Sequence, residues 1–320
     1  MSAAAPLTTA ADPAALAAPP TEAAFVLADV SRLVRPRIAL MVLATVVTAF
    51  WITGGGRADS VHLIGLLAGT ALVAASSSIA NQILERDTDR LMPRTARRPI
   101  VAGTLSVAAA TGLAAATLVA GTIMTTASAG WPAAAAAIAT WLLYVVVYTP
   151  MKKYSPLNTA VGAVAGALPV AIGWLAADGP ARLAAGDAAS ALTAAALGTV
   201  LYLWQFPHFM AIAWLYRGQY AAAGLRMLTV DDPSGLRAAG QSLAAALAMV
   251  PVSLVLAVPS GSIRLFLAAA VASIVYGGAA VRFAVRRDDA SARTLLLVSL
   301  GSLLALLTAT VLFGQPRPFH

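Results

Sequence analysis

The chain has no cysteine among its 320 residues and very few charged ones. The absence of thiols excludes disulfides, thiolate-bound metals and a cysteine nucleophile. Only 11% of the residues are charged whereas 60% are hydrophobic, and this balance excludes an ordinary soluble domain. The first 28 residues contain no Lys or Arg. They therefore lack the basic start of a secretory signal, and we expect residues 1–28 to form a disordered cytoplasmic tail.

Long apolar runs follow this tail, and about 20 apolar residues suffice to cross a bilayer. The sequence therefore predicts an all-α polytopic membrane protein with a single transmembrane domain at residues 29–315. We expect nine transmembrane helices, at residues 37–53, 61–84, 103–126, 130–149, 157–177, 188–213, 239–257, 262–282 and 292–313.

The basic residues are distributed unevenly between the predicted loops. With nine helices, seventeen of the 21 Lys and Arg residues fall on one side of the membrane. Because cytoplasmic loops are enriched in these residues, that side is predicted to be cytoplasmic, with the N-terminus inside and the C-terminus outside. The basic residues lie in short loops between apolar runs, which indicates topology and anionic lipid rather than a nucleic-acid partner.

Acidic residues are scarce, only 13 in the chain, yet three of them lie within positions 85–89. If the preceding helix continues, Asn81, Glu85 and Asp89 share one face, whereas Asp87 points away from it. Such oxygen ligands beside arginines suit a divalent cation, Mg²⁺ for example, that carries a diphosphate. A solvated topology loop is one alternative, but it explains poorly why the polar Asn81 and Gln82 end a span. A structural salt-bridge network is the other alternative.

Basic and aromatic residues near this face are candidates for binding the diphosphate. Pro93 is expected to end the helix, so the arginines after it lie in a loop that can fold over a ligand. Tyr148, Lys152 and Lys153 lie at the end of the fourth predicted helix, at residues 130–149. An interfacial aromatic belt with snorkelling lysines explains them as well as diphosphate binding does. The candidates are Arg86, Arg90, Arg94, Arg97 and Arg98, with Tyr148, Lys152 and Lys153 at the end of the fourth run.

The sixth predicted helix contains Gln205 and His208 in an aromatic stretch that runs from Trp204 to Phe209. An ionisable residue within a membrane span is a candidate site residue by default. Aromatic faces could also stabilise a carbocation. The alternatives are a structural histidine and simple aromatic packing.

These segments together resemble the intramembrane prenyltransferases of the UbiA superfamily, and within it the protohaem IX farnesyltransferases. The asparagine–carboxylate series alone indicates only the superfamily. The continuation Arg94-Thr-x-x-Arg98-Pro99 and the stretch Trp204-Gln-x-Pro-His208-Phe209 indicate the haem branch. Further resembling segments, between about Val30 and Thr310, are Arg35-Pro36-Arg37, Tyr148-Thr-Pro, Asn158 with Gly162, Gly166, Pro169, Gly173 and Trp174, and Ala223-Gly224 with Met227-Leu228.

The resemblance implies transfer of a farnesyl group from farnesyl diphosphate to a vinyl group of haem B, giving haem O, in a bacterial-type cytoplasmic membrane. Mg²⁺ is the implied cofactor, and a downstream haem-modifying or oxidase-assembly protein is an implied partner. The implied metal ligands are Asn81, Glu85 and Asp89; Arg94, Arg98 and Lys152 would assist the departing diphosphate; His208, with Trp204, Gln205 and Phe209, would bind the haem.

Two positions depart from the family pattern. Glu85 stands where Asp is more common, and Gln219 stands where the second acidic motif has Asp before Tyr220. Asp231 and Asp232 are either a replacement pair of metal ligands or part of an Asp-Pro-Ser-Gly turn. Three other functions stay open: a prenyltransferase for a quinone precursor, a membrane transporter and a structural membrane subunit.

Overall fold

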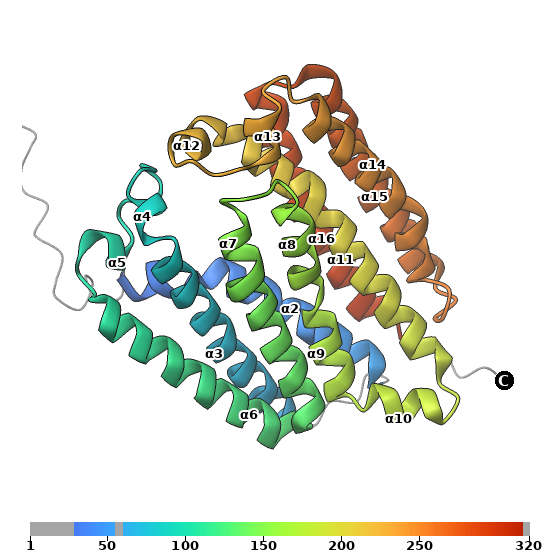
Figure 1. The fold of residues 1–320 in the computed structure, drawn as a ribbon. Coiled ribbons are helices and arrows are strands. Elements are labelled where there is room, and N and C mark those ends of the chain that lie inside the picture. Colours follow the sequence, from blue (N-terminus) through green and yellow to red (C-terminus); the bar gives the residue numbers. More distant parts are fainter. Residues whose placement is uncertain (1–28, 55–59, 316–320) are drawn as a thin grey trace, which may run out of the picture.

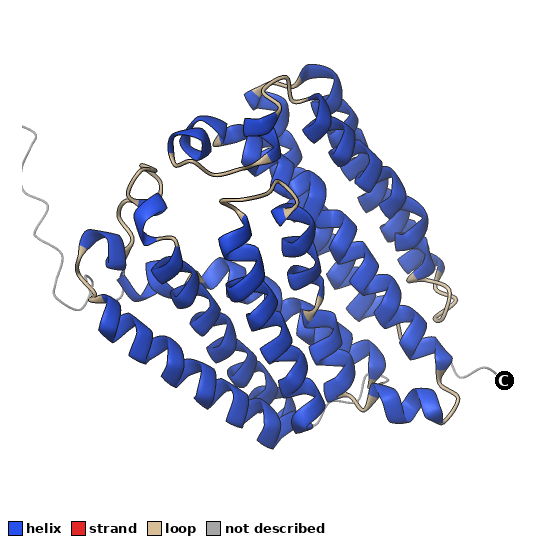
Figure 2. Ribbon diagram, in the orientation of Figure 1, coloured by secondary structure: helices blue, strands red, loops and turns tan. Residues whose placement is uncertain are grey.

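The computed structural model describes residues 29–54 and 60–315, so the predicted tail at 1–28 lies outside the described residues. Every regular element in the described part is a helix (Figure 2). The long helices are α2 (Pro36–Thr53), α3 (Ser60–Leu84), α6 (Val107–Leu142), α11 (Ala188–Leu215), α14 (Leu236–Val255), α15 (Ile263–Arg286) and α16 (Asp289–Phe313).

Shorter helices lie between them. Two of these, α8 (Asn158–Ala167) and α9 (Pro169–Ala176), follow one another and form a single span. A π-helix at Leu143–Tyr148 continues α6. The remaining short helices are α4 (Arg86–Asp89), α5 (Pro99–Ala102), α7 (Thr149–Met151), α10 (Gly179–Ala184), α12 (Arg217–Ala222) and α13 (Leu228–Asp231).

Eight continuous helical segments of the described residues are long and apolar enough to cross a membrane. One of them, Val107–Met151, has 45 residues. At about 1.5 Å per residue it would be about twice as long as the ~30 Å hydrocarbon core. Gly130 has non-helical angles (φ 79°, ψ 165°), and the chain reverses direction there (Figure 1). This segment therefore crosses twice, and the described residues make the nine crossings expected from the sequence.

Close backbone contact joins α3 to α6. A Cβ on Gly121 would lie 2.7 Å from the carbonyl oxygen of Gly69, which is too close for any residue except glycine. Small residues are the usual means of close helix packing in lipid, where apolar burial alone gives no preference for a neighbouring helix.

The long helices carry their connecting loops at two ends of the bundle. The elements α4, α5, α12 and α13 lie at one end, whereas α10 lies at the other (Figure 1). The first end contains most of the basic residues, as the charge distribution predicts for the described part of the chain. Helix α11 is the most buried of the spans and forms one wall of the central cavity.

Candidate active site

A cavity of about 490 Å³ opens among α2, α3, α8, α11, α16 and the π-helix. Its middle is apolar, with Val73, Ile172, Leu201 and Leu303 on the walls. Ionisable side chains gather at the end next to α4, and polar groups of α11 lie on the opposite wall. The cavity thus combines a charged end with an apolar body, as a site for an amphiphilic ligand requires.

The acidic face forms as the helical spacing predicts. Helix α3 ends at Leu84, yet the amide of Glu85 still donates to the carbonyl of Asn81 (2.9 Å), and Asp89 donates to Glu85 (2.8 Å). The side chains of Asn81, Glu85 and Asp89 are all buried, whereas that of Asp87 is 73% exposed. The expectation that Asp87 points away from this face is therefore confirmed.

Basic side chains from two loops pair with these carboxylates. Lys152 Nζ lies 2.7 Å from Glu85 Oε1, and Arg98 Nη1 lies 3.6 Å from Glu85 Oε2. Arg98 also donates to Asp89 Oδ2. Burial favours a high pKa for Glu85, but the charge and hydrogen bond of Lys152, with Arg35 and Arg98, hold it below its ordinary value.

The pKa values of Asp89 and Lys152 in this cluster shift in the opposite sense. Burial raises the pKa of Asp89 despite the neighbouring Arg98. Burial also favours a low pKa for Lys152, but the charge and hydrogen bond of Glu85, together with Tyr148 and Tyr144, raise that pKa above its ordinary value. Glu85 and Lys152 are thus charged at neutral pH, and the charged end of the cavity contains a buried ion pair.

A hydroxyl group orients Asn81. The Thr149 hydroxyl donates its one proton to the carbonyl of Tyr144 (2.8 Å), which has no proton to give. Thr149 must therefore accept from the Asn81 amide, whose Nδ2 lies 3.0 Å away. The Oδ1 atoms of Asn81 and Asp89 are buried and have no hydrogen-bond partner among the described residues.

These two free oxygens fit a hard cation, because buried acceptors without a partner are costly and Mg²⁺ prefers oxygen ligands. The described residues contain no group of three or more His, Cys, Asp and Glu side chains arranged as a complete metal site. This agrees with the usual coordination of Mg²⁺, which takes one or two carboxylates and completes its shell with water and substrate phosphate.

Aromatic rings surround the charged end. Lys152 Nζ lies 4.4 Å from the centre of the Tyr148 ring, and the rings of Tyr144 and Tyr148 are 5.4 Å apart. The guanidinium of Arg94 lies 4.5 Å from the centre of the Tyr216 ring and donates to the Tyr220 hydroxyl (3.3 Å). The loop that contains Arg94 and Arg98 is thereby joined to α12 across the mouth of the cavity.

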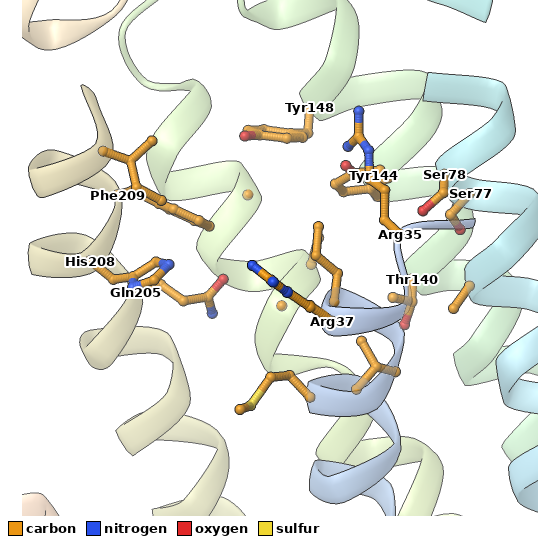
Figure 3. Close-up of a pocket in the computed structure, with 18 of the residues that line it drawn as sticks. Arg35, Arg37, Ser77, Ser78, Thr140, Tyr144, Tyr148, Gln205, His208 and Phe209 are labelled. Carbon is orange, nitrogen blue, oxygen red and sulfur yellow. The ribbon is translucent and has the colours of Figure 1, made fainter. Parts of the chain in front are cut away.

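The opposite wall contains the polar residues of α11 (Figure 3). The amide nitrogen of Gln205 donates to the carbonyls of Ala163 (2.9 Å) and Leu201 (3.0 Å), so its carbonyl oxygen is left to face Gly166 and the cavity. His208 and Phe209 also line the cavity. The structure therefore brings Trp204, Gln205, His208 and Phe209 to one ligand-facing wall, opposite the carboxylate cluster.

Four of the predicted diphosphate-binding residues do not line the cavity. Arg86 and Arg90 interact with Asp87 on the surface (3.2 and 4.0 Å). Arg97 and Lys153 are not among the described residues that line the cavity.

Asp231 and Asp232, the second acidic pair, both contact other residues of the chain. Asp231 pairs with Arg226 at 3.1 Å. Asp232 accepts from the amide and hydroxyl of Ser234, and from the amide of Arg237. The turn interpretation therefore holds for Asp232.

Several cavity residues were not singled out by their chemistry in the sequence. Arg35 and Arg37 both line the cavity, and in Figure 3 Arg37 extends toward Gln205 and His208. The sequence signal for them is only their position at the start of a span, where an arginine can also extend to the membrane surface. Thr149 gave no such signal.

Comparison with known proteins decides the family. The model of the UbiA prenyltransferase family matches residues 42–312. The chain belongs to the UbiA prenyltransferase family. It is 42% identical over 288 residues to a protein of Rhodopirellula baltica named protoheme IX farnesyltransferase, covering 88% of this chain and 98% of the relative. This chain is therefore a membrane-embedded prenyltransferase.

Solved structures share the fold at low identity. A digeranylgeranylglyceryl phosphate synthase superposes with a TM-score of 0.72 at 14% identity, over 90% of this prenyltransferase and 98% of that chain. A UbiA homologue from Archaeoglobus fulgidus, bound to GPP and Mg²⁺, superposes with a TM-score of 0.63 at 18% identity, over 88% of this chain and 99% of that one. The neighbours confirm the all-helical UbiA architecture.

Proposed function

We propose that this prenyltransferase transfers the farnesyl group of farnesyl diphosphate to a vinyl group of haem B, giving haem O. The observation that carries the proposal is the arrangement of one cavity. The carboxylate and cation cluster lies at one end, apolar walls lie between, and His208 lies on the far wall. The name of the Rhodopirellula baltica relative supports the same substrates.

Asn81, Glu85 and Asp89 are the residues that we propose hold Mg²⁺. The free Oδ1 atoms of Asn81 and Asp89 support this assignment, and the Mg²⁺ in the Archaeoglobus fulgidus homologue is consistent with it. When bound, the ion would supply Lewis-acid stabilisation of charge on the diphosphate oxygens.

The protein's own cations would assist the departure of the diphosphate. Arg94 and Arg98 belong to the loop over the cavity mouth. Lys152 also lines the cavity, and its ammonium group pairs with Glu85. Their N–H groups donate to the oxygens on which charge develops as the carbon–oxygen bond breaks. Such electrostatic stabilisation is usually the largest catalytic contribution. Outside the cavity, Arg86, Arg90, Arg97 and Lys153 would attract the anionic substrate to this end of the bundle.

The apolar body of the cavity would hold the farnesyl chain and exclude water until the new bond has formed. Tyr144, Tyr148 and Phe209 line it and offer aromatic faces to the allylic cation. The vinyl group supplies the electron pair for the new carbon–carbon bond. Water then adds to the resulting cation and loses a proton, which leaves the hydroxyl group of the product.

We further propose that the charged end faces the cytoplasm in a bacterial-type cytoplasmic membrane. The concentration of basic residues at that end supports this orientation. A water-soluble prenyl diphosphate headgroup would then reach the site from the cytoplasm. The product is very apolar, so a membrane-bound haem-modifying or oxidase-assembly protein is the expected consumer.

Mass analysis of haem tests the proposal. Nanodiscs that contain the purified chain would be incubated with haem B, farnesyl diphosphate and Mg²⁺, with Asp89→Asn as the matched control. We expect a haem that has gained one farnesyl and one hydroxyl group, formed only by the unsubstituted chain. Parallel reactions with 4-hydroxybenzoate in place of haem test the quinone branch. A prenylated phenol without any haem adduct would overturn the proposal.

A further inference from the structure

A serine hydroxyl on α16 contacts the imidazole of His208. The Nδ1 atom of His208 lies 2.8 Å from the Oγ of Ser299, ninety-one positions away in the chain. Ser299 is completely buried, and its hydroxyl also lies 2.6 Å from the carbonyl oxygen of Leu296. Each of these two contacts needs a proton between its heavy atoms.

The donors and acceptors allow only one arrangement. A carbonyl oxygen has no proton, so the single proton of the Ser299 hydroxyl must lie toward Leu296. The contact with His208 can then be a hydrogen bond only if Nδ1 carries a proton and donates it. In the neutral imidazole, the other ring nitrogen, Nε2, is consequently left with a free lone pair.

The plane of the imidazole is fixed as well. The Trp204 ring stacks on it, with centroids 4.7 Å apart and planes inclined by 24°. Trp204 Nε1 in turn donates to the backbone carbonyl of Ser299 (2.7 Å), and the Tyr276 hydroxyl donates to the carbonyl of Trp204 (2.7 Å). A single residue, Ser299, thus orients both rings.

The imidazole lines the cavity and is directed into it, facing Arg37 (Figure 3). We infer that Ser299 is a positioning residue that fixes His208 as its Nδ1–H tautomer, so that Nε2 offers a lone pair to the iron of the acceptor porphyrin. This inference rests on the proposed function, because that function supplies the iron. A histidine that ligates a metal usually donates its other N–H to an oxygen, as His208 does here.

Porphyrin binding without farnesyl diphosphate tests the inference. The chain in nanodiscs would be titrated with ferric haem and with metal-free protoporphyrin IX, and the Soret absorption would be followed. Four variants are needed: Ser299→Ala, Ser299→Thr, His208→Ala and Ser302→Ala. The last makes the same substitution at a buried serine of the same helix that is not among the cavity-lining residues.

We expect Ser299→Ala to weaken ferric haem binding by about 10- to 100-fold, the usual effect of removing the partner of a metal-bound histidine. Binding of the metal-free porphyrin should not change, Ser299→Thr should restore haem binding, and Ser302→Ala should resemble the unsubstituted chain. His208→Ala should remove the spectral signature of nitrogen ligation.

Two results would overturn the inference while leaving the proposed function standing. One is unchanged haem affinity in Ser299→Ala. The other is an equal loss of affinity for both porphyrins together with a lower melting temperature, which would mean that Ser299 only packs the bundle. Failure of the unsubstituted chain to bind either porphyrin would instead contradict the proposed function itself.

Discussion

Replacing Lys152 by methionine should separate the stability of the active site from its chemistry. The side chains of Lys152 and Glu85 are only 16% and 10% exposed, and their charged atoms are 2.7 Å apart. Removing one member of a buried ion pair typically costs about 3–5 kcal/mol, since the other charge stays buried without its partner. Arg98 still lies 3.6 Å from Glu85 and compensates in part, so we expect a loss of about 3 kcal/mol.

The double variant Lys152→Met/Glu85→Gln distinguishes the two effects. It removes both charges, so most of the lost stability should return. Activity should not return, because the double variant lacks both the charge-assisted contact of Lys152 with the diphosphate and the carboxylate of the proposed metal ligand Glu85. That contact contributes about 1.5–3 kcal/mol, or about ten- to a hundredfold in kcat/KM.

The pH dependence follows from the same pair. The pKa of Glu85 lies below its ordinary value of 4.5, so its charged form stabilises the fold above that pH. This stabilisation is lost as the pH falls toward the lowered pKa. Without Lys152, burial dominates and the pKa of Glu85 should rise. The acid limb of kcat/KM should therefore move to higher pH in Lys152→Met. When Glu85 is glutamine, the contribution of Glu85 to that limb should be absent.

Melting temperatures in nanodiscs and initial rates between pH 5 and pH 9 measure these effects for the two single variants and the double variant. Equal stability of Lys152→Met and the unsubstituted chain would refute the reasoning about the buried pair. Full activity of the double variant would refute the role of Lys152 in diphosphate departure.

Four further predictions concern the two ends of the cavity. Asp89→Asn should abolish turnover while the protein still inserts into the membrane. EDTA should abolish the activity of the unsubstituted chain, and added Mg²⁺ should restore it. Normal turnover by Asp89→Asn would exclude the metal assignment. Thr149→Val should raise the Mg²⁺ concentration needed for half-maximal rate by about 10- to 100-fold, whereas Thr149→Ser should not. Arg94→Ala should lower kcat/KM for farnesyl diphosphate by about ten- to a hundredfold, and an equal loss in the exposed Arg286→Ala would show that general surface charge is responsible. Arg37→Gln should raise KM for haem but not for its dimethyl ester, since a guanidinium facing the acceptor suits a carboxylate; an equal rise for both would contradict this contact.

Properties that depend on neighbouring residues could be predicted from the sequence. Hydrophobic length alone located the nine crossings, including the reversal near Gly130 that joins two spans into one continuous helical segment. The helical period alone placed Asn81, Glu85 and Asp89 on one face and Asp87 outside it. These predictions succeeded because hydrogen bonding between residues four apart determines which side chains share a face, even across the break after Leu84.

Contacts between distant segments were decided by the tertiary structure. The spacing of the arginines after Glu85 could not distinguish Arg98, which enters the carboxylate cluster, from Arg86, which pairs with Asp87 at the surface. That outcome depends on how the loop folds after Pro93 and on which helices meet beneath it.

The orientation of polar groups in the spans is also decided by contacts between distant segments. Thr149 lies 68 positions from Asn81, and Ser299 lies 91 positions from His208. Each hydroxyl directs its partner because its own proton is already committed to a backbone carbonyl. The sequence by itself therefore determined which residue types occupy each helix face. The packing of one helix against another decided which atoms of those residues remain free to bind a ligand, because Thr149 reaches Asn81, and Ser299 reaches His208, only where two segments distant in the chain meet.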